Sequence, residues 1–305
     1  MKTDRQGHIP VLMDEVLSFL DIKPGHVYID ATLGGGGHTR AILNAEPTCK
    51  VIGFDWDISV FEGVGQELAL QYPDRFFPVW GNFSRVDQLA KKAGFNQVDG
   101  ILADFGTSQI QIKNTEGLSV YKDTFLDMRL SAAHTKTTAY DVVNTFGENA
   151  LADILYTYAQ ESHGRKIARA IVQARKQKRI ETTFELADII TLVVPKTPNR
   201  RVHVATKTFQ ALRIFVNKEL EHIESFLKNA EHVLADGGRL VCISFHSLED
   251  RIVKQFFKSK NRNANSELFY EIITKNVCMA SHDELEENRS SRSARLRAAI
   301  LKKSI

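Results

Sequence analysis

The chain has 305 residues, of which 43% are hydrophobic and 25% charged, a balance typical of a folded protein with a sizeable core. Its three cysteines, Cys49, Cys242 and Cys278, are scattered and form no CxxC pair, which excludes a disulfide scaffold and indicates a reducing, cytoplasmic setting. No apolar run approaches the ~20 residues that cross a bilayer, and no apolar segment follows the polar N-terminus, so we expect neither a membrane protein nor a secretory leader.

Helical patterns separate the apolar, β-rich runs in the first third of the chain. Strands are predicted at 26–30, 50–55, 75–82, 99–104 and 238–247, and the early helices at 39–44 and 58–72. This alternation predicts an α/β fold with a parallel, doubly wound, Rossmann-like sheet. Two late runs, 268–275 and 296–303, are expected to add a strand pair at one edge of the sheet.

The gap between the fourth and fifth predicted strands is far longer than one crossover helix needs. Its apolar residues have helical spacing, and Thr182 with Glu185 makes a capping box. We therefore predict a helical domain at 113–206, inserted into a sheet domain formed by 1–112 and 207–305. One long helix, 206–234, is expected to lead back to the sheet.

Positive charge is concentrated in two segments, although the net charge is only +3. Residues 161–213 hold twelve Lys or Arg against four Asp or Glu, and residues 289–303 hold six Lys or Arg and no acid. A solvated face and a basic tail would explain this without any function. Such a concentration nevertheless favours a polyanionic partner, and we expect nucleic acid.

Polar residues follow the predicted strands at the edge where open α/β sheets bind ligands. They are Asp30 with the glycine run 34–37 after the first strand, Asp55 after the second, Asn82 and Phe83 after the third, and Asp104 after the fourth. Glycines allow a close backbone approach, and Asp55 lies 21 residues after Gly34, about where an acid binds a ribose hydroxyl pair. The edge therefore predicts a site for an adenosine-type cofactor.

The choice of cofactor rests on charge. The dinucleotide fingerprint G-x-G-x-x-G is not met, because Thr39 takes the place of its third glycine. Clustered carboxylates would repel a pyrophosphate but suit the ammonium and sulfonium groups of S-adenosylmethionine (SAM), with Phe83 against the adenine. Taken singly, the glycines could form a tight turn, Asp30 a helix cap and Phe83 a core aromatic. Their joint placement favours a SAM site.

Long sequence words in a specific order run through nearly the whole chain. They lie at 8–12, 30–38, 99–104, 126–129, 167–171, 208–214 (TFQALRI), 244–251 (SFHSLEDR) and 292–297. On these words the chain resembles the bacterial small-subunit rRNA (cytidine-N4) methyltransferase family, known as MraW or RsmH. The resemblance implies a Rossmann-like class I SAM methyltransferase domain with an inserted helical domain for substrate recognition.

The same resemblance implies the cofactor contacts and the substrate. The SAM contacts carry over onto Gly36, Gly37, His38, Asp55, Phe83, Asp104 and Gln111. The implied substrate is a cytidine in the decoding (P-site) region of 16S rRNA, in the small ribosomal subunit of the cytoplasm. The loop at 105–113 departs from the family pattern, since its second serine, its proline and its final aspartate are replaced. Two alternatives therefore stay open: a SAM enzyme for another RNA or nucleotide, and a ribosome-assembly factor that binds SAM and RNA without turnover.

Methyl transfer to an exocyclic amine needs no metal, and Glu249 has no second histidine at ligand spacing, so no metal is expected. The Asn/Asp-Pro-Pro-aromatic word of many amino-methyltransferases is absent after the fourth strand, which leaves Ser108, His246 or a loop carbonyl as candidate catalytic groups. Helical steps of four and seven place Arg165, Arg169 and Lys176 on one face for RNA phosphates. Lys207 and Arg213 complete the predicted RNA contacts. The sequence leaves the oligomeric state open.

Overall fold

The computed structural model describes residues 10–107, 112, 115–195, 202–261 and 267–303. The chain forms two compact units, one made of 1–106 with 220–305 and the other of 107–219. The second unit is longer at both ends than the predicted insertion of 113–206. Among the described residues, no helix has the length and apolar character that crossing a membrane requires.

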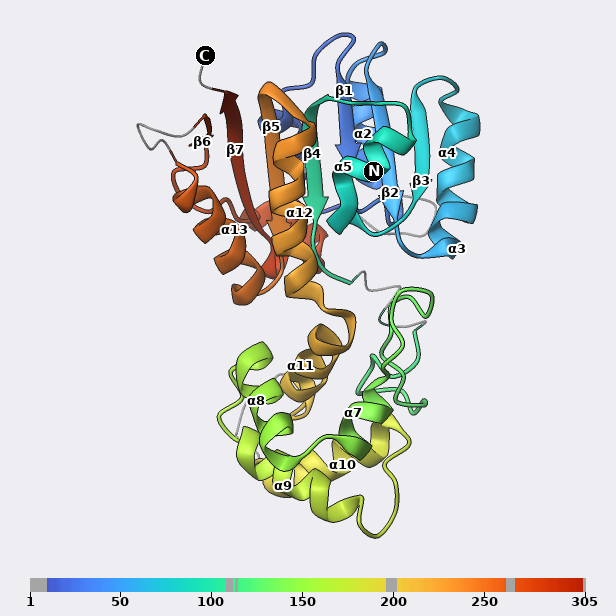
Figure 1. Ribbon diagram of the computed structural model, residues 1–305, viewed down its shortest axis with the longest axis vertical. Coiled ribbons are helices and arrows are strands. Elements are labelled where there is room, and N and C mark those ends of the chain that lie inside the picture. The colour runs from blue at the N-terminus through green and yellow to red at the C-terminus, as the bar shows by residue number, and fades with distance from the viewer. Residues whose placement is uncertain (1–9, 108–111, 113–114, 196–201, 262–266, 304–305) are drawn as a thin grey trace. The chain divides into compact units, whose positions relative to one another are not determined.

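The first unit contains a seven-stranded sheet in the order β3-β2-β1-β4-β5-β7-β6 (Figure 1). Its strands are β1 (Val27–Asp30), β2 (Lys50–Asp55), β3 (Phe76–Trp80), β4 (Val98–Asp104), β5 (Leu234–Ser244), β6 (Leu268–Ile272) and β7 (Arg295–Lys303). β1 to β5 are parallel, whereas β7 runs antiparallel between β5 and β6. The chain moves outward from β1 through β2 to β3 and then returns to the other side of β1 as β4. The point between β1 and β4 is therefore the switch at which such sheets bind ligands.

Helices cover both faces of this sheet, as the continuous burial of its central strands requires. The helices are α1 (Met13–Leu20), α2 (Gly37–Ala45), α3 (Ile58–Val60), α4 (Gln66–Gln71), α5 (Val86–Lys92), α12 (Glu219–Val233), α13 (Ser247–Ser259) and α14 (His282–Glu287), with a π-helical turn at Phe61–Gly65 and 3-10 turns at Phe83–Arg85 and Arg289–Ser293. Tyr28 packs with α1, α2 and α4, whereas its neighbour Ile29 packs on the opposite face with α5, α12 and α13. Helices α5, α12 and α13 lie in front of the sheet in Figure 1.

The second unit is helical and has its own hydrophobic core. It contains α7 (Ala139–Thr145), α8 (Glu148–Ala159), α9 (Gly164–Ala174), α10 (Thr183–Val193) and α11 (Thr206–Asn217). Capping boxes start two of these helices, with Thr138 and Asp141 at α7 and Thr182 and Glu185 at α10, and the second of these was predicted.

The predicted helix at 206–234 is wrong, because the structure has two helices there. α11 ends at Asn217, and Lys218 takes a left-handed conformation with φ 51° that no regular helix can continue through. The buried Asn217 side chain accepts the Leu130 N–H at 2.8 Å and donates to the Met128 carbonyl at 2.9 Å, so this end of α11 is tied to a loop of the helical unit. The packing of α11 therefore belongs to the helical unit.

Candidate functional site

Three carboxylates end three adjacent strands of the sheet. Asp55 ends β2, Asp30 ends β1 and Asp104 ends β4, in the spatial order β2-β1-β4. Asp30 and Asp55 are buried, at 1% and 8% exposure. The predicted gathering of these acids at one edge of the sheet is what the topology produces, because the carboxyl ends of parallel strands coincide.

The glycine-rich loop turns its own backbone donors inward. The Gly34 N–H donates to Oδ2 of Asp55 at 3.0 Å, and the Gly36 N–H donates to the Leu33 carbonyl at 2.7 Å. Gly34 and Gly36 have φ of 48° and 73°, the left-handed region that glycine tolerates best. Because these two N–H groups are already used, the loop is poorly suited to cradle a pyrophosphate, which agrees with the missing third glycine.

Backbone donors hold both carboxylate oxygens of Asp55. Its Oδ1 accepts from the Asp57 N–H at 2.9 Å, while Oδ2 accepts from Gly34. Burial raises the pKa of Asp55 to about 6, and the two backbone donors only partly oppose this rise. A carboxylate in this state gains from further donors, such as a pair of hydroxyl groups.

Asp104 is the least satisfied of the three acids. Its Oδ1 is buried and has no hydrogen-bond partner. Burial raises the pKa of Asp104 well above its usual range, and the charges of Asp30 and Glu249 raise it further. Burial also raises the pKa of Asp30, although His38 and the Thr39 hydroxyl, which donates to Asp30 at 2.7 Å, lower it in part. An unpartnered acceptor among buried acids fits a cationic ligand, and SAM carries two positive groups.

Aromatic side chains lie beside the carboxylates. Phe83 follows β3, and its ring is 5.7 Å from those of Phe105 and Phe226 and 6.3 Å from that of His222. His222 in turn meets Trp56, the residue after Asp55, edge to face at 5.8 Å. Phe83 is only partly buried, so it is both a core contact and an available apolar surface.

The remaining cofactor candidates lie at the start of α2. Gly36 is its N-cap, Gly37 its first residue, and His38 is buried in its first turn. Nε2 of His38 lies 2.9 Å from the Val11 carbonyl, and Nδ1 lies 4.0 Å from Oδ2 of Asp104. Gln111, the last predicted SAM contact, lies outside the described residues, as does Ser108, one of the two predicted catalytic groups.

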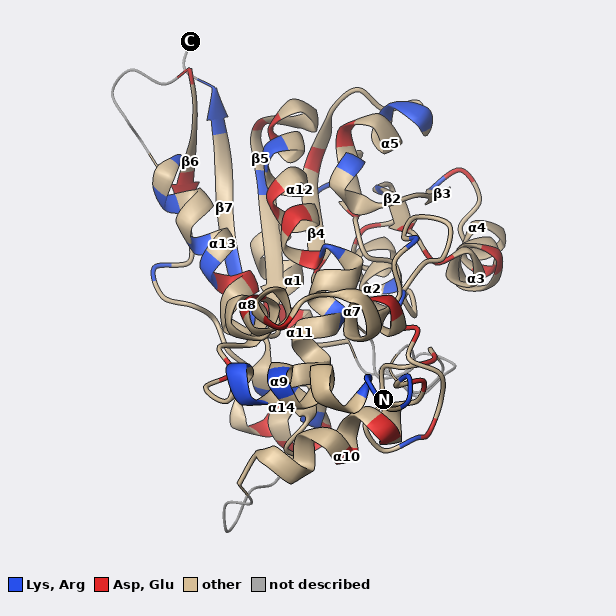
Figure 2. Cartoon of the chain, turned by 60° about the horizontal axis from the view of Figure 1, so that its bottom comes forward, with Lys and Arg blue, Asp and Glu red and all other residues tan. Residues whose placement is uncertain are grey.

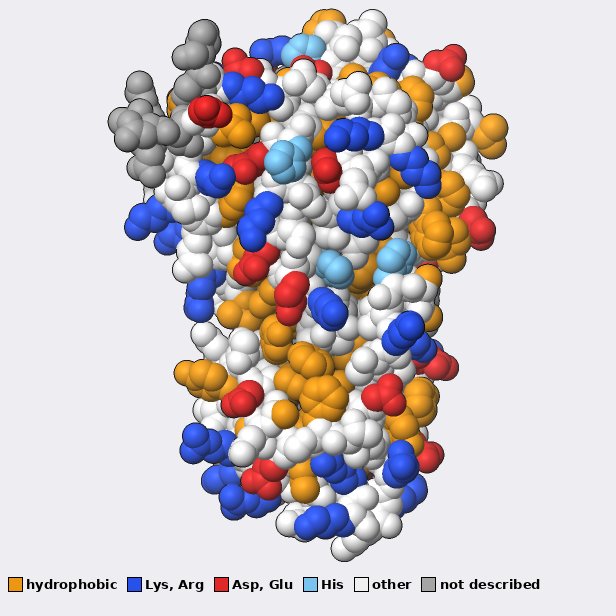
Figure 3. Space-filling model, viewed as in Figure 1, with side chains coloured by type: hydrophobic (Ala, Val, Ile, Leu, Met, Phe, Trp, Pro, Cys, Tyr) orange, Lys and Arg blue, Asp and Glu red, His pale blue; other side chains and the backbone are white. Residues whose placement is uncertain are grey.

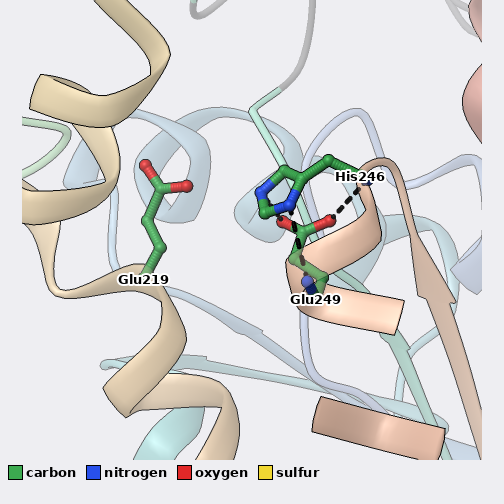
Figure 4. A group of neighbouring side chains, drawn as sticks. All are labelled: Glu219, His246 and Glu249. Atoms are coloured by element: carbon green, nitrogen blue, oxygen red, sulfur yellow. Dashed lines mark hydrogen bonds and ion pairs between the residues drawn. The ribbon is translucent and has the colours of Figure 1, made fainter. Parts of the chain in front are cut away.

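His246 has a defined structural role at the N-terminus of α13. Its ring nitrogen Nδ1 accepts from the Glu249 N–H at 3.4 Å, and Oε2 of Glu249 accepts the His246 N–H at 3.2 Å (Figure 4). The same Oε2 also accepts the Phe245 N–H at 2.7 Å. This capping box ends β5 at Ser244, before the predicted end at 247, whereas the strand begins at Leu234, before the predicted start at 238. Glu219, also drawn in Figure 4, belongs to the helical unit and pairs with Arg213 there. A catalytic role for His246 stays a prediction.

The predicted RNA contacts have unequal surroundings within the helical unit. Arg165 and Lys207 are exposed. Arg169 is also exposed, with its Nε 3.3 Å from Oε1 of Glu148. Figure 2 shows the basic residues of α9 in blue. Lys176 is exposed but not on the helix as predicted, because α9 ends at Ala174 and the Lys176 N–H donates to the Gln173 carbonyl in a tighter turn. RNA binding by these residues stays a prediction.

Arg213 differs from the other predicted RNA contacts. Its guanidinium makes a bidentate pair with Glu219 at 2.8 and 2.9 Å and donates to the Thr107 hydroxyl at 2.9 Å. Only 16% of its side chain is exposed. The charge of Arg213 is therefore compensated inside the unit, and its first role is to hold α11 and the segment at Thr107 together.

Two groups of site neighbours were not predicted from the sequence. The first group is Trp56 and His222, whose rings lie next to Phe83. The second is Glu284, which accepts the Leu12 N–H at 2.7 Å, and Leu12 directly follows Val11, the residue that contacts His38. Trp56 could have been found, since it directly follows Asp55. No local pattern points to Glu284, which is separated from Leu12 by 272 residues.

The fold and the site together define a class of protein. The chain has a seven-stranded sheet with an antiparallel β7, a glycine loop after β1 and an acid at the end of β2. These features define a class I SAM-dependent methyltransferase. The sequence profile of the MraW methylase family matches residues 5–302, and the chain belongs to that family.

Relatives that share most of their length with this chain carry one name, ribosomal RNA small subunit methyltransferase H. The chain is 42% identical to the protein of Carboxydothermus hydrogenoformans, with 96% of this chain and 97% of the relative covered. It is 44% identical to that of a Sulfurihydrogenibium species, with 95% and 97% covered, and 43% identical to that of Ehrlichia canis, with 96% and 99% covered. A solved SAM-dependent O-methyltransferase from Thermotoga maritima is similar at 9% identity and a TM-score of 0.42, with 96% of this chain and 65% of that one covered.

Proposed function

We propose that this protein transfers a methyl group from SAM to the exocyclic N4 amine of a cytidine in the decoding region of 16S rRNA. The observation that carries the proposal is the row of acidic residues at the carboxyl ends of β2, β1 and β4, which suits a positively charged ligand. The chain that holds them belongs to a methylase family over residues 5–302. Asp104, with its unpartnered buried Oδ1, is the least satisfied acid of that edge. The names of the relatives support small-subunit rRNA as the substrate.

Each residue of the edge has an expected task in holding the cofactor. Asp55 accepts hydrogen bonds from the ribose hydroxyls, Asp104 and Asp30 lie toward the positive groups, and Phe83 packs against the adenine. Gly36, Gly37 and His38 form the wall at the start of α2, and Gln111 completes the predicted set. When bound, SAM supplies an electrophilic methyl group on a sulfonium.

The protein's contribution to the reaction is orientation and proton transfer. The lone pair of the cytosine amine is delocalised into the ring, so an acceptor that takes an N–H hydrogen bond helps to localise it. The amine nitrogen bonds to the methyl carbon as the carbon–sulfur bond breaks, and the amine proton passes to a base. The candidate acceptors are Ser108, His246 and the backbone carbonyls of the loop after Asp104.

The helical unit is proposed to capture the RNA. The exposed Arg165, Arg169, Lys176 and Lys207 offer charge to phosphates, and six phosphate contacts would lower the affinity by roughly a thousandfold between 50 and 200 mM salt. Large exposed hydrophobic side chains also occur on this unit, among them Tyr121, Phe125, Tyr156 and Phe184. Figure 3 shows hydrophobic side chains, in orange, on one face of the molecule. Such aromatic rings suit the faces of unpaired bases. The target cytidine must be unstacked for its amine to reach the methyl group.

Nucleoside mass spectrometry of small-subunit rRNA from a strain that lacks the gene tests the proposal. We expect N4-methylated cytidine to disappear and to return when the wild-type gene is restored. If the modification persists in the deletion strain, rRNA cytidine is not the substrate. Label transferred from SAM to tRNA or to a free nucleotide would then favour an enzyme for another substrate. SAM binding without any transfer would favour an assembly factor.

A further inference from the structure

A short segment of the N-terminus, Pro10–Leu12, lies directly against the proposed cofactor loop; we call it the strap. Pro10 is buried against Gly37 so closely that a Cβ atom on Gly37 would lie 2.2 Å from the proline Cγ. The carbonyl of Val11 lies 2.9 Å from Nε2 of His38. Two consecutive residues of the strap thus contact two consecutive residues of α2.

The His38 ring is fixed by this contact. A carbonyl oxygen only accepts hydrogen bonds, so the 2.9 Å contact with Val11 requires the proton on Nε2. The other nitrogen, Nδ1, then faces Oδ2 of Asp104 at 4.0 Å. His38 is only 7% exposed, so bulk water does little to weaken this arrangement. The strap therefore sets which nitrogen of His38 faces Asp104.

The strap itself is held in a conformation that it would not adopt unaided. Leu12 has φ 51°, in the left-handed region, and stands at the N-cap of α1 with no side-chain oxygen to offer. A leucine in this region costs free energy and persists only where the surroundings enforce it. The buried Leu12 side chain and the Val16 N–H, which donates to the Leu12 carbonyl at 2.9 Å, hold the residue on the side of α1. Its own N–H donates to Oε1 of Glu284 at 2.7 Å, which is the contact that reaches it from α14.

Glu284 is an unfavourable choice if its only purpose is stability. It reaches Leu12 from α14, next to Asp14 and Glu15 in the first turn of α1. Partial burial raises the pKa of Glu284, and the like charges of Glu15 and Asp14 raise it further. The negative charge of Glu284 is not stabilised by these acidic neighbours. Its hydrogen bond to the strap is therefore the interaction that explains its position.

We propose that Glu284 is a positioning residue for the cofactor site: by anchoring Leu12 it holds the strap, and through Val11 it fixes the ring of His38 toward Asp104. The inference rests on the proposed function in one respect, namely that the site so ordered binds SAM. It extends that function to a residue on α14, far from the glycine loop in sequence.

The experiment compares variants of the full-length protein. Glu284→Ala removes the acceptor, Glu284→Asp retracts it by one methylene at the same charge, and Glu284→Gln keeps an acceptor oxygen without the charge. Arg239→Ala is the matched control, because Arg239 anchors the other end of α1 through the Phe19 carbonyl at 3.0 Å and Asp21 at 2.7 Å but does not reach the strap. SAM affinity is measured by calorimetry, and the His38 tautomer by the ¹⁵N shifts of its ring in the unliganded protein.

We expect Glu284→Ala and Glu284→Asp to weaken SAM binding by about tenfold, as the loss of one hydrogen bond with reorganisation would, and to shift His38 toward a tautomer mixture. Glu284→Gln should stay within about threefold of the wild type, and Arg239→Ala should lower the melting temperature while leaving SAM affinity and the His38 shifts unchanged. Wild-type His38 shifts and affinity in Glu284→Ala or Glu284→Asp would overturn the inference, as would a Glu284→Gln variant as defective as Glu284→Ala. If the wild type binds no SAM, the proposed function fails, and the His38 shifts still decide the role of Glu284.

Discussion

The buried His38 and the partly buried Asp104 face each other in the proposed site, with Nδ1 of the histidine 4.0 Å from Oδ2 of the aspartate. The aspartate has an unpartnered oxygen, and the neighbouring Asp30 adds a second buried acid. Without a cation the edge must retain protons or tolerate repulsion between its acids. A positively charged ligand relieves both, so cofactor binding and proton release should be coupled.

Asp104→Asn should stabilise the unliganded protein at neutral pH while removing cofactor binding. The folded state raises the pKa of Asp104, so the stabilising effect of this group is complete only below its unfolded pKa and is lost as the pH rises through the folded value. Asparagine avoids that loss, and we expect the melting temperature to rise by about 2–4 °C at pH 7.5, with little change near pH 4. Differential scanning fluorimetry at the two pH values measures this. Equal effects at both would contradict a raised pKa.

The affinity for SAM should fall as the pH is lowered through about 6, the pKa of Asp55. Ribose hydroxyls donate to the ionised carboxylate, so protonation of Asp55 competes with binding and costs about tenfold for each pH unit below its pKa. Calorimetric titrations between pH 5 and 8 check the slope. Asp55→Ala should bind more weakly at pH 8 and lose most of the slope, and a wild-type affinity in that variant would remove Asp55 from the site.

The strands and the edge were predictable because buried strands are apolar runs that end in polar residues. The strand at 50–55 was predicted at the bounds that it has, and each of the three acids was placed at its strand end. Local pattern failed where tertiary contacts decide. Apolar spacing continues through Lys218, but the ties of Asn217 to Met128 and Leu130 end α11 there.

Gly37→Ala adds only one methyl group, but it should both destabilise the protein and disrupt the proposed cofactor site. The added Cβ would overlap Pro10, so the strap or the loop must move. We expect about 2 kcal/mol of destabilisation, within the range for overpacking, and a clear loss of SAM affinity. Gly63→Ala is the control, because nothing lies within 4 Å of its added Cβ and its φ is unstrained. It should be neutral or stabilising by up to about 1 kcal/mol. Similar effects of the two variants in urea unfolding and calorimetry would argue against the close approach.

The partners of charged residues are the part of the site that the sequence could not supply. Arg213 belongs to a long family word and was predicted to contact RNA, yet its pairing with Glu219 and Thr107 gives it a structural task. The contact between Glu284 and Leu12 spans 272 residues and leaves no periodic trace. Both depend on how distant elements pack rather than on local spacing.

Removing cations from the helical unit should reduce the salt dependence of RNA binding. Arg165→Ala combined with Lys176→Ala deletes two proposed phosphate contacts, and the slope of log K against log salt should become shallower by about two. The control pair is Lys91→Ala with Lys92→Ala on α5, which should leave the slope unchanged. Filter binding to small-subunit rRNA between 50 and 200 mM salt measures both. An unchanged slope in the first variant would place the RNA contacts elsewhere.

Methyl transfer by the purified protein tests the central claim most directly. Small subunits from the deletion strain are incubated with the protein and SAM carrying a deuterated methyl group, and the digested nucleosides are analysed by mass spectrometry. We expect the deuterated methyl group on N4 of cytidine from 16S rRNA, and none with the Asp104→Asn variant. Label on another nucleoside, or no label although SAM binds, would contradict the proposed function.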